Sequence, residues 1–312
     1  MTVKRDHGGG LDAAIADFGG TREGWADLST GINPIAFPVP QLSADAWTAL
    51  PDQYSADRLT AAARRFWNVP DGADILAAPG ASVLIAQIPR LAAASTVCIP
   101  PPTYNEHAAS FSDHGWTVKT QGAAHAQVLV NPNNPDGRIW SPQDVTAPLN
   151  IIDESFCDVM PARSLMSLAD RPGTLILKSF GKFWGMAGLR LGFVCGDPRL
   201  VARLRDMLGP WPVSGIALEI GAAALTDTQW ADQTRARLHT DAARLDAVMS
   251  RRGAILAGGT SLFRLYRVED AAEWQARLAR HHVWSRIFPY ASDLIRLGLP
   301  APNAWPQIES AL

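Results

Sequence analysis

From Ile75 onward, short apolar runs alternate with segments whose apolar residues recur at helical spacing. Apolar runs bounded by polar, glycine or proline residues predict buried strands, and helical spacing predicts amphipathic helices. The helices predicted between the strands include Ser82–Ala94 and Asn105–His114. This alternation predicts an α/β fold, in which helices cover both faces of a mostly parallel sheet. The predicted strands are Ile75–Ala78, Thr96–Ile99, Trp116–Lys119, Gln127–Val130, Asn150–Ile152, Leu175–Lys178 and Gly192–Cys195.

The two ends of the chain differ from this central pattern. Residues 7–40 are rich in glycine and proline and predict an arm with one short helix around Leu11–Phe18. Beyond Pro212 the pattern becomes helical and then mixed, which predicts an α+β domain. We therefore divide the chain into an arm (1–40), a large domain (41–212), and interdomain helices with a small domain (213–312). The remaining predicted elements are helices at Ala44–Leu50, Asp57–Trp67, Ile216–Leu225, Trp230–Arg251 and Ala271–His281, and strands at Ser261–Val268 and Leu294–Leu299.

Composition narrows the class of protein. The 312 residues are 47% hydrophobic and 19% charged, as expected of a globular protein with a substantial core. A net charge of −2 gives no electrostatic reason to expect nucleic acid or a membrane surface as a partner. Cys98, Cys157 and Cys195 lie in apolar runs without metal-ligand spacing, so we expect reduced interior thiols and no metal site. No apolar run is long enough to cross a membrane, and the N-terminus lacks a signal peptide's apolar core, so we expect a cytoplasmic enzyme.

The stretch Thr174–Gly196 carries the most specific chemical signal. Two apolar runs flank a turn that contains Gly181, Lys182, Gly188 and Arg190. Lysines are seldom interior unless they are paired or chemically used, and burial favours the neutral amine that attacks carbonyls. An arginine behind a tight glycine turn suits an anion held near that lysine. A nucleophilic amine beside a phosphate site is what pyridoxal phosphate requires, although a structural strand–turn–strand with a stray lysine is the alternative.

The motif that runs from Ser179 and Lys182 through Ala187-Gly188-Leu189-Arg190 to Gly192 resembles the lysine signature of fold-type I pyridoxal-phosphate enzymes. This is the aspartate-aminotransferase superfamily, and the Ala-Gly-Leu-Arg variant is closest to its histidinol-phosphate aminotransferase branch. The resemblance implies pyridoxal 5'-phosphate as cofactor, bound to Lys182. It also implies a large domain with a mostly parallel seven-stranded sheet, and a smaller α+β domain that the N-terminal arm joins. A homodimer with its sites at the subunit interface is the assembly that it implies.

The cofactor's phosphate has a candidate cradle after the first strand of the sheet. Gly80-Ala81-Ser82 closes that strand and opens a helix, where free backbone N–H groups and the helix dipole favour an anion. Many turns of this kind are structural only. Together with Lys182 and Arg190, however, the turn predicts the phosphate site, to which Ser179 contributes.

Two further motifs predict contacts with the cofactor ring. Tyr104 follows a stiff run of three prolines, and in related enzymes an aromatic residue at this place covers the ring. An ordinary turn tyrosine is the alternative. The segment Val130–Gly137 resembles the superfamily's Asn-Pro-x-Asn-Pro-Thr-Gly motif, with Asp136 in place of the threonine. The resemblance implies that Asn134 donates to the phenolic oxygen of the ring, although a double Asn-Pro turn can also be purely structural.

Two charged residues at strand positions predict the remaining contacts. Asp153 ends an apolar run, where an unpaired buried carboxylate is costly. Facing a protonated pyridine nitrogen, it is stabilised and keeps the ring an electron sink. The superfamily commonly has a tyrosine where Phe156 stands, so one donor to the phenolic oxygen is lost here. Near the C-terminus, Arg296 matches the arginine that binds the substrate α-carboxylate.

The choice of reaction depends on features outside the cofactor motifs. Several segments resemble threonine-phosphate decarboxylases, namely His7–Gly9, Leu11–Ala14, Asp27–Pro34, Ser179–Phe183 and Phe288–Pro300. Histidinol-phosphate aminotransferases commonly have serine before the lysine, where this chain has Gly181. They also commonly have a Tyr-Pro-Asp-Pro motif, where this chain has Leu50-Pro51-Asp52-Gln53. The resemblance therefore predicts decarboxylation of L-threonine O-3-phosphate to (R)-1-amino-2-propanol O-2-phosphate for cobalamin biosynthesis. An aminotransferase of the histidinol-phosphate type is the first alternative.

A non-catalytic cofactor-sensing module is a second alternative, which the absence of a basic or helix-turn-helix stretch before His7 disfavours. A phosphorylated substrate also needs an anion site besides the one for the cofactor. Each candidate for that site could equally be a solvated polar or charged residue, and we favour His7 and Arg264. The candidates are His7, Asn33, Arg264, Arg267 and Arg286.

Overall fold

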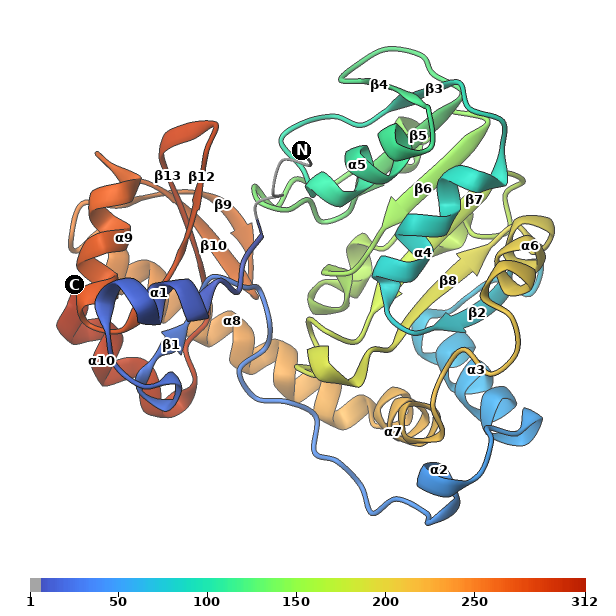
Figure 1. The fold of residues 1–312 in the computed structure, drawn as a ribbon, viewed down its shortest axis with the longest axis horizontal. Helices are drawn as coiled ribbons and strands as arrows, with labels where there is room; N and C mark the ends of the chain where they lie inside the picture. Colours follow the sequence, from blue (N-terminus) through green and yellow to red (C-terminus); the bar gives the residue numbers. More distant parts are fainter. Residues whose placement is uncertain (1–6) are drawn as a thin grey trace. The chain divides into compact units, whose positions relative to one another are not determined.

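The computed structural model describes residues 7–312, which form two compact units (Figure 1). The larger unit comprises residues 36–134 and 138–233, and the smaller one comprises 135–137, 234–312 and the described residues up to Ile35. The larger unit thus continues past the predicted boundary at residue 212. Helix α7 (Gly215–Thr226) packs on α3 (Gln53–Trp67). A β-carbon at Gly221 would lie 2.8 Å from a methyl carbon of Leu59, so glycine permits this close approach.

The larger unit is built on a seven-stranded sheet in the order β2-β8-β7-β6-β5-β3-β4. Strand β8 runs antiparallel to its neighbours β2 and β7, and the adjacent pairs from β7 to β4 are parallel. Each predicted strand of the central region is present, and the prediction of a mostly parallel sheet is confirmed. The strands are β2 (Asp74–Ala78), β3 (Thr96–Cys98), β4 (Thr117–Lys119), β5 (Ala126–Val130), β6 (Leu149–Asp153), β7 (Thr174–Ser179) and β8 (Gly192–Gly196).

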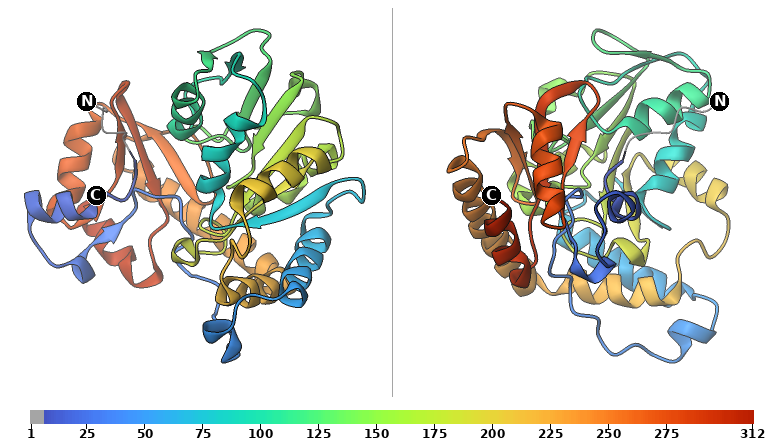
Figure 2. Two further views of the ribbon diagram at one scale, coloured as in Figure 1. Left: turned by 45° about the vertical axis from the view of Figure 1, so that its right-hand side comes forward. Right: turned by 60° about the vertical axis from the view of Figure 1, so that its left-hand side comes forward.

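Helices cover both faces of this sheet (Figure 1), and Figure 2 shows the same sheet from two further sides. On one face, Val194 belongs to a buried cluster with Leu84 of α4 (Ala81–Gln87), Phe111 of α5 (Asn105–Asp113) and Leu204 of α6 (Pro198–Leu208). On the other face, the ring of Phe193 lies 4.9 Å from that of Trp67 in α3. Adjacent strand residues point to opposite faces, which is why consecutive residues serve two separate cores.

Two helices of the larger unit differ from the prediction. The helix predicted at Ser82–Ala94 ends at Gln87 and continues as a 3₁₀ turn, Ile88–Leu91, because Pro89 has no N–H to donate. Helix α6 was not predicted, although Asp197 caps it and Pro198 occupies its first turn. That pair is a recognisable start signal. The short helix α2 spans Asp45–Thr48.

The smaller unit contains a four-stranded antiparallel sheet in the order β12-β13-β10-β9. Strand β9 was not predicted, because Gly258 and Gly259 made the segment read as a loop. A β-carbon on Gly258 would clash with the backbone oxygen of Asp136, and Gly259 has a positive φ of 120°. The strands are β9 (Ile255–Thr260), β10 (Phe263–Arg267), β12 (Arg286–Phe288) and β13 (Ala291–Gly298), and β1 (Ala26–Asp27) pairs with β11 (Val283–Trp284). The helices are α1 (Leu11–Phe18), α9 (Ala271–Arg280), α10 (Trp305–Ala311) and α8 (Thr228–Ser250), which starts in the larger unit.

Within residues 7–312, every helix is too short or too polar to span a lipid bilayer. The arrangement of the larger sheet instead determines where a site can form. Strands β3, β5, β6 and β7 are parallel, so their carboxyl ends meet at one edge. Strand β8 is antiparallel, so its amino end, just after Arg190, meets the same edge. Ligands of α/β sheets bind at this kind of edge.

Candidate active site

A pocket in the larger unit lies at the carboxyl edge of the sheet. The structure brings together in this pocket the predicted residues of five separate motifs, although their contacts with a cofactor stay predictions. Gly80, the remaining predicted cofactor residue, immediately precedes the lining residue Ala81. The pocket is lined by Ala81, Ser82, Ile85, Tyr104, Val130, Asn134, Asp153, Ser155, Phe156, Ser179, Lys182 and Arg190.

Asp153 ends strand β6 with a buried carboxylate that has defined partners. Oδ2 lies 2.9 Å from Nε2 of His107, and Oδ1 accepts hydrogen bonds from the backbone N–H (2.9 Å) and hydroxyl (2.6 Å) of Ser155. Burial by itself would raise the pKa of Asp153, but the hydrogen bond and charge of His107 and the bonds from Ser155 lower it overall. The carboxylate therefore stays ionised and can neutralise a cation in the pocket.

His107 was missed by the sequence interpretation. It lies on α5, and it is 1% exposed. The sequence offered one signal for it: His107 lies four positions before Phe111, so both side chains lie on the buried face of the helix. That signal marks His107 as interior but does not name its partner, which is 46 positions away in the sequence.

Arg190 and Ser82 form the polar end of the pocket. Arg190 Nη2 donates to Oγ of Ser82 at 3.0 Å, and Nη1 donates to the backbone oxygen of Ala187 at 3.1 Å. Gly80 has a positive φ of 90°, and a β-carbon there would lie 2.5 Å from Nη2 of Arg190. Glycine at position 80 therefore leaves the space in which the guanidinium reaches the start of α4. A guanidinium, a hydroxyl and backbone N–H groups together suit a phosphate.

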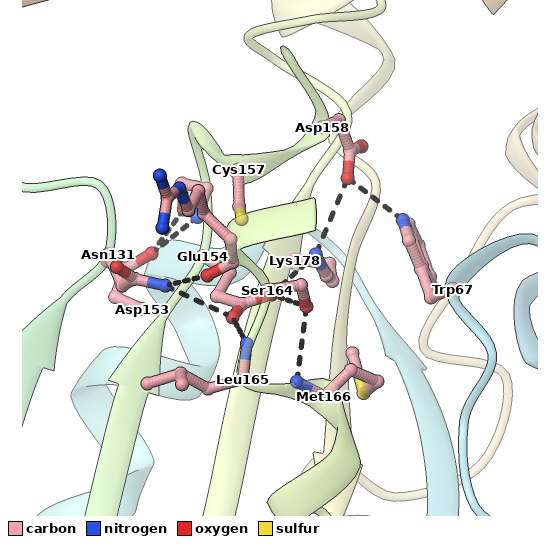
Figure 3. A network of polar contacts seen from close by, with 12 residues as sticks. Trp67, Asn131, Asp153, Glu154, Cys157, Asp158, Ser164, Leu165, Met166 and Lys178 are labelled. Carbon is pink, nitrogen blue, oxygen red and sulfur yellow. Dashed lines mark hydrogen bonds and ion pairs between the residues drawn. The ribbon is translucent and has the colours of Figure 1, made fainter. Parts of the chain in front are cut away.

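Two lysines lie four residues apart near this edge, and their surroundings separate their roles. Lys178 is 2% exposed and lies 2.7 Å from Oε2 of Glu154 and 3.5 Å from Oδ1 of Asp158 (Figure 3). Burial alone would lower the pKa of Lys178, but the charges of Glu154 and Asp158 outweigh it and raise the pKa. Lys178 stays protonated and is no nucleophile. Lys182 lines the pocket, with Nζ 5.3 Å from the centre of the Phe156 ring.

The turn that carries Lys182 is anchored by aromatic side chains. Phe180, Phe183 and Trp184 are fully buried on either side of it. The Phe180 and Trp184 rings stack at 5.2 Å, and Trp184 stacks on Trp230 at 5.4 Å. A half-buried lysine between fully buried neighbours has a backbone that packing holds in place, as a positioned nucleophile requires.

The turns that carry Tyr104 and Asn134 are tied to each other. Asn133, which the sequence interpretation did not single out, accepts a hydrogen bond from Thr103 Oγ1 at 2.6 Å and donates to the backbone oxygen of Pro102 at 2.8 Å. Burial, followed by the charges of Glu106 and Asp153, raises the pKa of Tyr104 to about 12. Tyr104 therefore presents a neutral phenol to the pocket at physiological pH.

The smaller unit holds the predicted substrate residues. Arg296 on β13 is buried, and its Nη2 donates to the backbone oxygen of Ser29 at 2.7 Å. Arg286 on β12 is its direct cross-strand partner. Burial, followed by the charge of Arg286, lowers the pKa of Arg296 to about 10. Two like charges opposite each other weaken a sheet unless an anion joins them.

The other candidates in the smaller unit have different surroundings. Arg264 makes a two-pronged ion pair with Asp246, at 3.0 and 2.7 Å, so much of its guanidinium is engaged within the protein. Asn33 is buried and accepts hydrogen bonds from Arg237 Nη2 at 2.7 Å and from the N–H of Ile35 at 3.0 Å. His7 is exposed at the start of the described chain. The predicted role of each in binding the substrate stays a prediction.

The donor set of the pocket fits pyridoxal phosphate. Asp153 suits the ring nitrogen, Lys182 the aldehyde carbon, and Arg190 with Ser82 the phosphate. Space is reserved for Arg190 by the missing side chain of Gly80, which is an observation independent of the motif. Among residues 7–312, no group of three or more His, Cys, Asp or Glu side chains is arranged to hold a metal ion.

The chain is similar to known proteins over nearly its whole length. The family described as aminotransferase class I and II matches residues 36–304. A threonine-phosphate decarboxylase of Sinorhizobium sp is 40% identical over 97% of this chain and 96% of its own length. A threonine-phosphate decarboxylase of Pseudomonas aeruginosa is 36% identical over 98% of this chain and 97% of its own length.

The fold is also similar to that of solved structures. The histidinol-phosphate aminotransferase from Sinorhizobium meliloti, in complex with pyridoxal-5'-phosphate, matches with a TM-score of 0.82 at 19% identity. The match covers 100% of this chain and 94% of that one. This likeness confirms the predicted fold-type I architecture.

Proposed function

Because the chain belongs to the aminotransferase class I and II family, we propose that it is a pyridoxal-phosphate-dependent carboxy-lyase. Its substrate is L-threonine O-3-phosphate, and its products are (R)-1-amino-2-propanol O-2-phosphate and CO2, as cobalamin biosynthesis requires. The observation that carries the proposal is the similarity to two threonine-phosphate decarboxylases, at 40% and 36% identity over almost the full chain. The pocket around Lys182 supports it with a donor set that fits the cofactor.

In this proposal the larger unit holds the cofactor. Lys182 would form the covalent link, and Asp153 would pair with the ring nitrogen. Arg190, Ser82 and the N–H groups at the start of α4 would bind the phosphate. Tyr104 would cover the ring, Asn134 would donate to its phenolic oxygen, and Ala81 and Ser179 would lie at the phosphate end. Bound pyridoxal phosphate would supply the electron sink for the electron pair left at the substrate Cα when CO2 departs.

The protein's own groups select the bond and handle the proton. Arg296 binds the α-carboxylate with its planar fork, which orients the Cα–carboxylate bond for cleavage. With its amine in the pocket, Lys182 would hold the proton that is delivered to Cα once CO2 has left. Phe156 stands where the superfamily commonly has a tyrosine, so one donor to the phenolic oxygen of the ring would be lost here.

We propose that Arg286 and Arg296 together bind the two anionic groups of the substrate. They are cross-strand partners on β12 and β13, and the lowered pKa of Arg296 reflects burial and the neighbouring charge. An anion between them offsets that repulsion. A substrate that carries both a carboxylate and a phosphate supplies two such charges. His7, Asn33 and Arg264 are the further candidates for the phosphate.

Product analysis with L-threonine O-3-phosphate tests the reaction. The purified protein, loaded with pyridoxal phosphate, is expected to release CO2 and an amino-alcohol phosphate without any 2-oxoacid. Consumption of substrate only in the presence of 2-oxoglutarate, with formation of glutamate, would overturn decarboxylation. It would support the alternative, an aminotransferase of the histidinol-phosphate type, whose fold this chain shares.

We also propose that the protein is a homodimer. Large apolar side chains are exposed on the larger unit around α2 and the start of α3, where Trp47, Leu50 and Tyr54 are 67%, 68% and 69% exposed. Trp211 is 58% exposed and lines one hollow with Pro51 and Gln53. Exposed apolar groups gathered in one place favour a protein interface, and a second copy of the chain is the expected occupant.

A further inference from the structure

A buried ionic network lies next to the candidate active site (Figure 3). Three site residues lie on three separate segments, Asp153 at the end of β6, Asn134 in the turn after β5, and Lys182 in the turn after β7. The network consists of Glu154, Lys178 and Asp158, each at most 5% exposed. None of the three lines the pocket. Their function is therefore a separate question.

Glu154 connects β6, β7 and the Asn134 turn. Its Oε2 lies 2.7 Å from Lys178 Nζ and accepts from Ser164 Oγ at 2.6 Å. Its Oε1 accepts from the N–H of Leu165 at 2.5 Å and from Nδ2 of Asn131 at 3.4 Å. Asn131 begins the turn that carries Asn134, and Glu154 is the neighbour of Asp153 in the chain. Glu154 thus directly follows Asp153 in the chain and is hydrogen-bonded to the segment that carries Asn134.

Asp158 connects the network to the Lys182 turn. Its Oδ1 lies 3.5 Å from Lys178 Nζ and accepts from the indole Nε1 of Trp67 at 2.9 Å. Its Oδ2 accepts from Nε1 of Trp184 at 3.2 Å. Trp184 lies two residues after Lys182 in the same turn. Trp67, in contrast, lies on α3, a helix that contains none of the candidate site residues.

Stability alone does not account for three buried charges. Well-packed apolar residues of similar volume often stabilise a core as much as a buried ion pair does, because burying charges costs solvation energy. Charged hydrogen bonds, however, demand defined directions and distances, which apolar contacts do not. In this network those demands fall on the segments that hold Asp153, Asn134 and Lys182.

We propose that Glu154, Lys178 and Asp158 are positioning residues, which hold the three strand ends in the register that the cofactor site needs. The inference rests on the proposed binding of pyridoxal phosphate. They act through Asp153, Asn134 and Lys182 and touch neither cofactor nor substrate. Positioning groups behind metal ligands contribute on the order of 10–100-fold in affinity, and we expect effects toward the lower end of that range here.

The test compares two substitutions that each remove one indole hydrogen bond from the same carboxylate. Trp184→Phe cuts the link between Asp158 and the Lys182 turn, and Trp67→Phe cuts the link to α3. The readouts are the dissociation constant for pyridoxal phosphate, the pKa at which the visible absorption of the bound cofactor titrates, and the melting temperature. We expect Trp184→Phe to weaken cofactor binding about tenfold and to shift that pKa. Trp67→Phe is expected to lower the melting temperature and leave both other readouts as in the unsubstituted protein.

Glu154→Gln is the second variant, because it keeps the size of the side chain and removes the charge that faces Lys178. Ile176→Val, on the buried strand β7 that carries Lys178, is its control for a general loss of stability. We expect Glu154→Gln to weaken cofactor binding, and Ile176→Val to leave it unchanged. The inference would be overturned if Trp184→Phe and Glu154→Gln both lowered the melting temperature but left the affinity for pyridoxal phosphate and the absorption pKa unchanged. Failure of the unsubstituted protein to bind pyridoxal phosphate would instead contradict the proposed function.

Discussion

Nε2 of His107 lies 2.9 Å from Oδ2 of Asp153, and the two side chains are 1% and 4% exposed. The contact joins α5 to the end of β6, across one face of the sheet. It opposes the effect of burial on Asp153 and keeps the pKa of the carboxyl below its ordinary value. A buried carboxylate without such a partner would take up a proton instead.

We expect His107→Ala to reduce activity by about 10–100-fold, since losing a hydrogen bond to a buried charge costs about 1.5–3 kcal/mol. Without His107, burial raises the pKa of Asp153, so the acid limb of the pH–rate profile moves to higher pH. The lowered pKa also stabilises the folded state above the carboxyl's unfolded pKa, and that contribution is lost as pH falls through the folded pKa. The variant is therefore expected to lose less stability on acidification.

His114→Ala is the matched control for His107. His114 ends the same helix, is exposed, and bonds only locally to the backbone oxygen of Ser110, at 2.8 Å, among the bonds described. Its removal is expected to leave the pH–rate profile in place. Identical profiles for the two variants would contradict the role given to His107.

Gly80→Ala is expected to weaken cofactor binding. A methyl group at this position would lie 2.5 Å from Nη2 of Arg190 and displace the guanidinium from Ser82. The backbone of Gly80, at φ 90° and ψ 151°, is one that other residues rarely adopt, which adds strain on the order of 1–3 kcal/mol. Titration of the protein with pyridoxal phosphate, followed by absorption, measures the loss.

Two glycine controls separate these causes. Gly122→Ala also places a side chain at a positive φ, of 83°, with no atom within 4 Å of the new methyl group. Gly188→Ala adds a methyl group in open space close to Arg190 in the chain. Both should bind the cofactor as the unsubstituted protein does. Equal loss in Gly122→Ala would assign the effect to strain and not to Arg190.

Lys182→Ala and Lys178→Ala are expected to have opposite signatures. Lys182→Ala removes the visible absorption of the covalently bound cofactor and leaves the melting temperature nearly unchanged. Lys178→Ala leaves the buried Glu154 and Asp158 without their cation, which lowers the free energy of unfolding by about 3–5 kcal/mol. Absorption spectra and urea unfolding measure the two effects. A Lys182→Ala protein that keeps the absorption band would refute the lysine assignment.

Substrate binding is expected to depend on the charge of Arg296 at alkaline pH. Burial and Arg286 lower its pKa to about 10. The charged form binds the carboxylate, so affinity is present below that pKa and is lost as pH rises through it. KM should therefore rise above about pH 10, with a smaller change in kcat. Arg286→Gln removes the neighbouring charge and should move this rise to higher pH, while a KM that stays flat to pH 11 would argue against Arg296.

The exposed apolar residues of the larger unit predict a dimer that charged substitutions in this patch disrupt. Leu50→Asp combined with Tyr54→Asp is expected to give a monomer in sedimentation or light-scattering measurements. Ile255→Asp on β9 is the control, because its side chain is similarly exposed, at 65%, but lies in the smaller unit. If only Ile255→Asp gave a monomer, the interface would lie on the smaller unit instead. If the unsubstituted protein were a monomer, the proposed dimer would be excluded.

Much of the fold and most of the residues that line the candidate pocket were predictable from local sequence. The strands of the larger sheet are short apolar runs, and the pocket residues lie directly after them, where parallel strands present their carboxyl ends. Strand β9 was not predicted, because its glycines, which make room for the backbone of Asp136, are typical of a loop. Helix α6 was also not predicted, although Asp197 and Pro198 are a recognisable start signal.

The amino-acid sequence by itself thus determined the α/β class, and it identified the candidate lysine and the residues expected around a cofactor. Only the tertiary structure decided which partner each charge has. His107 reaches Asp153 across 46 positions, and Lys178 is paired with Glu154 and Asp158, which excludes it as a nucleophile. The physical reason is that apolar periodicity and turn chemistry act over a few neighbouring residues. A buried ion pair, in contrast, depends on strand order and register, which place distant residues within hydrogen-bond distance.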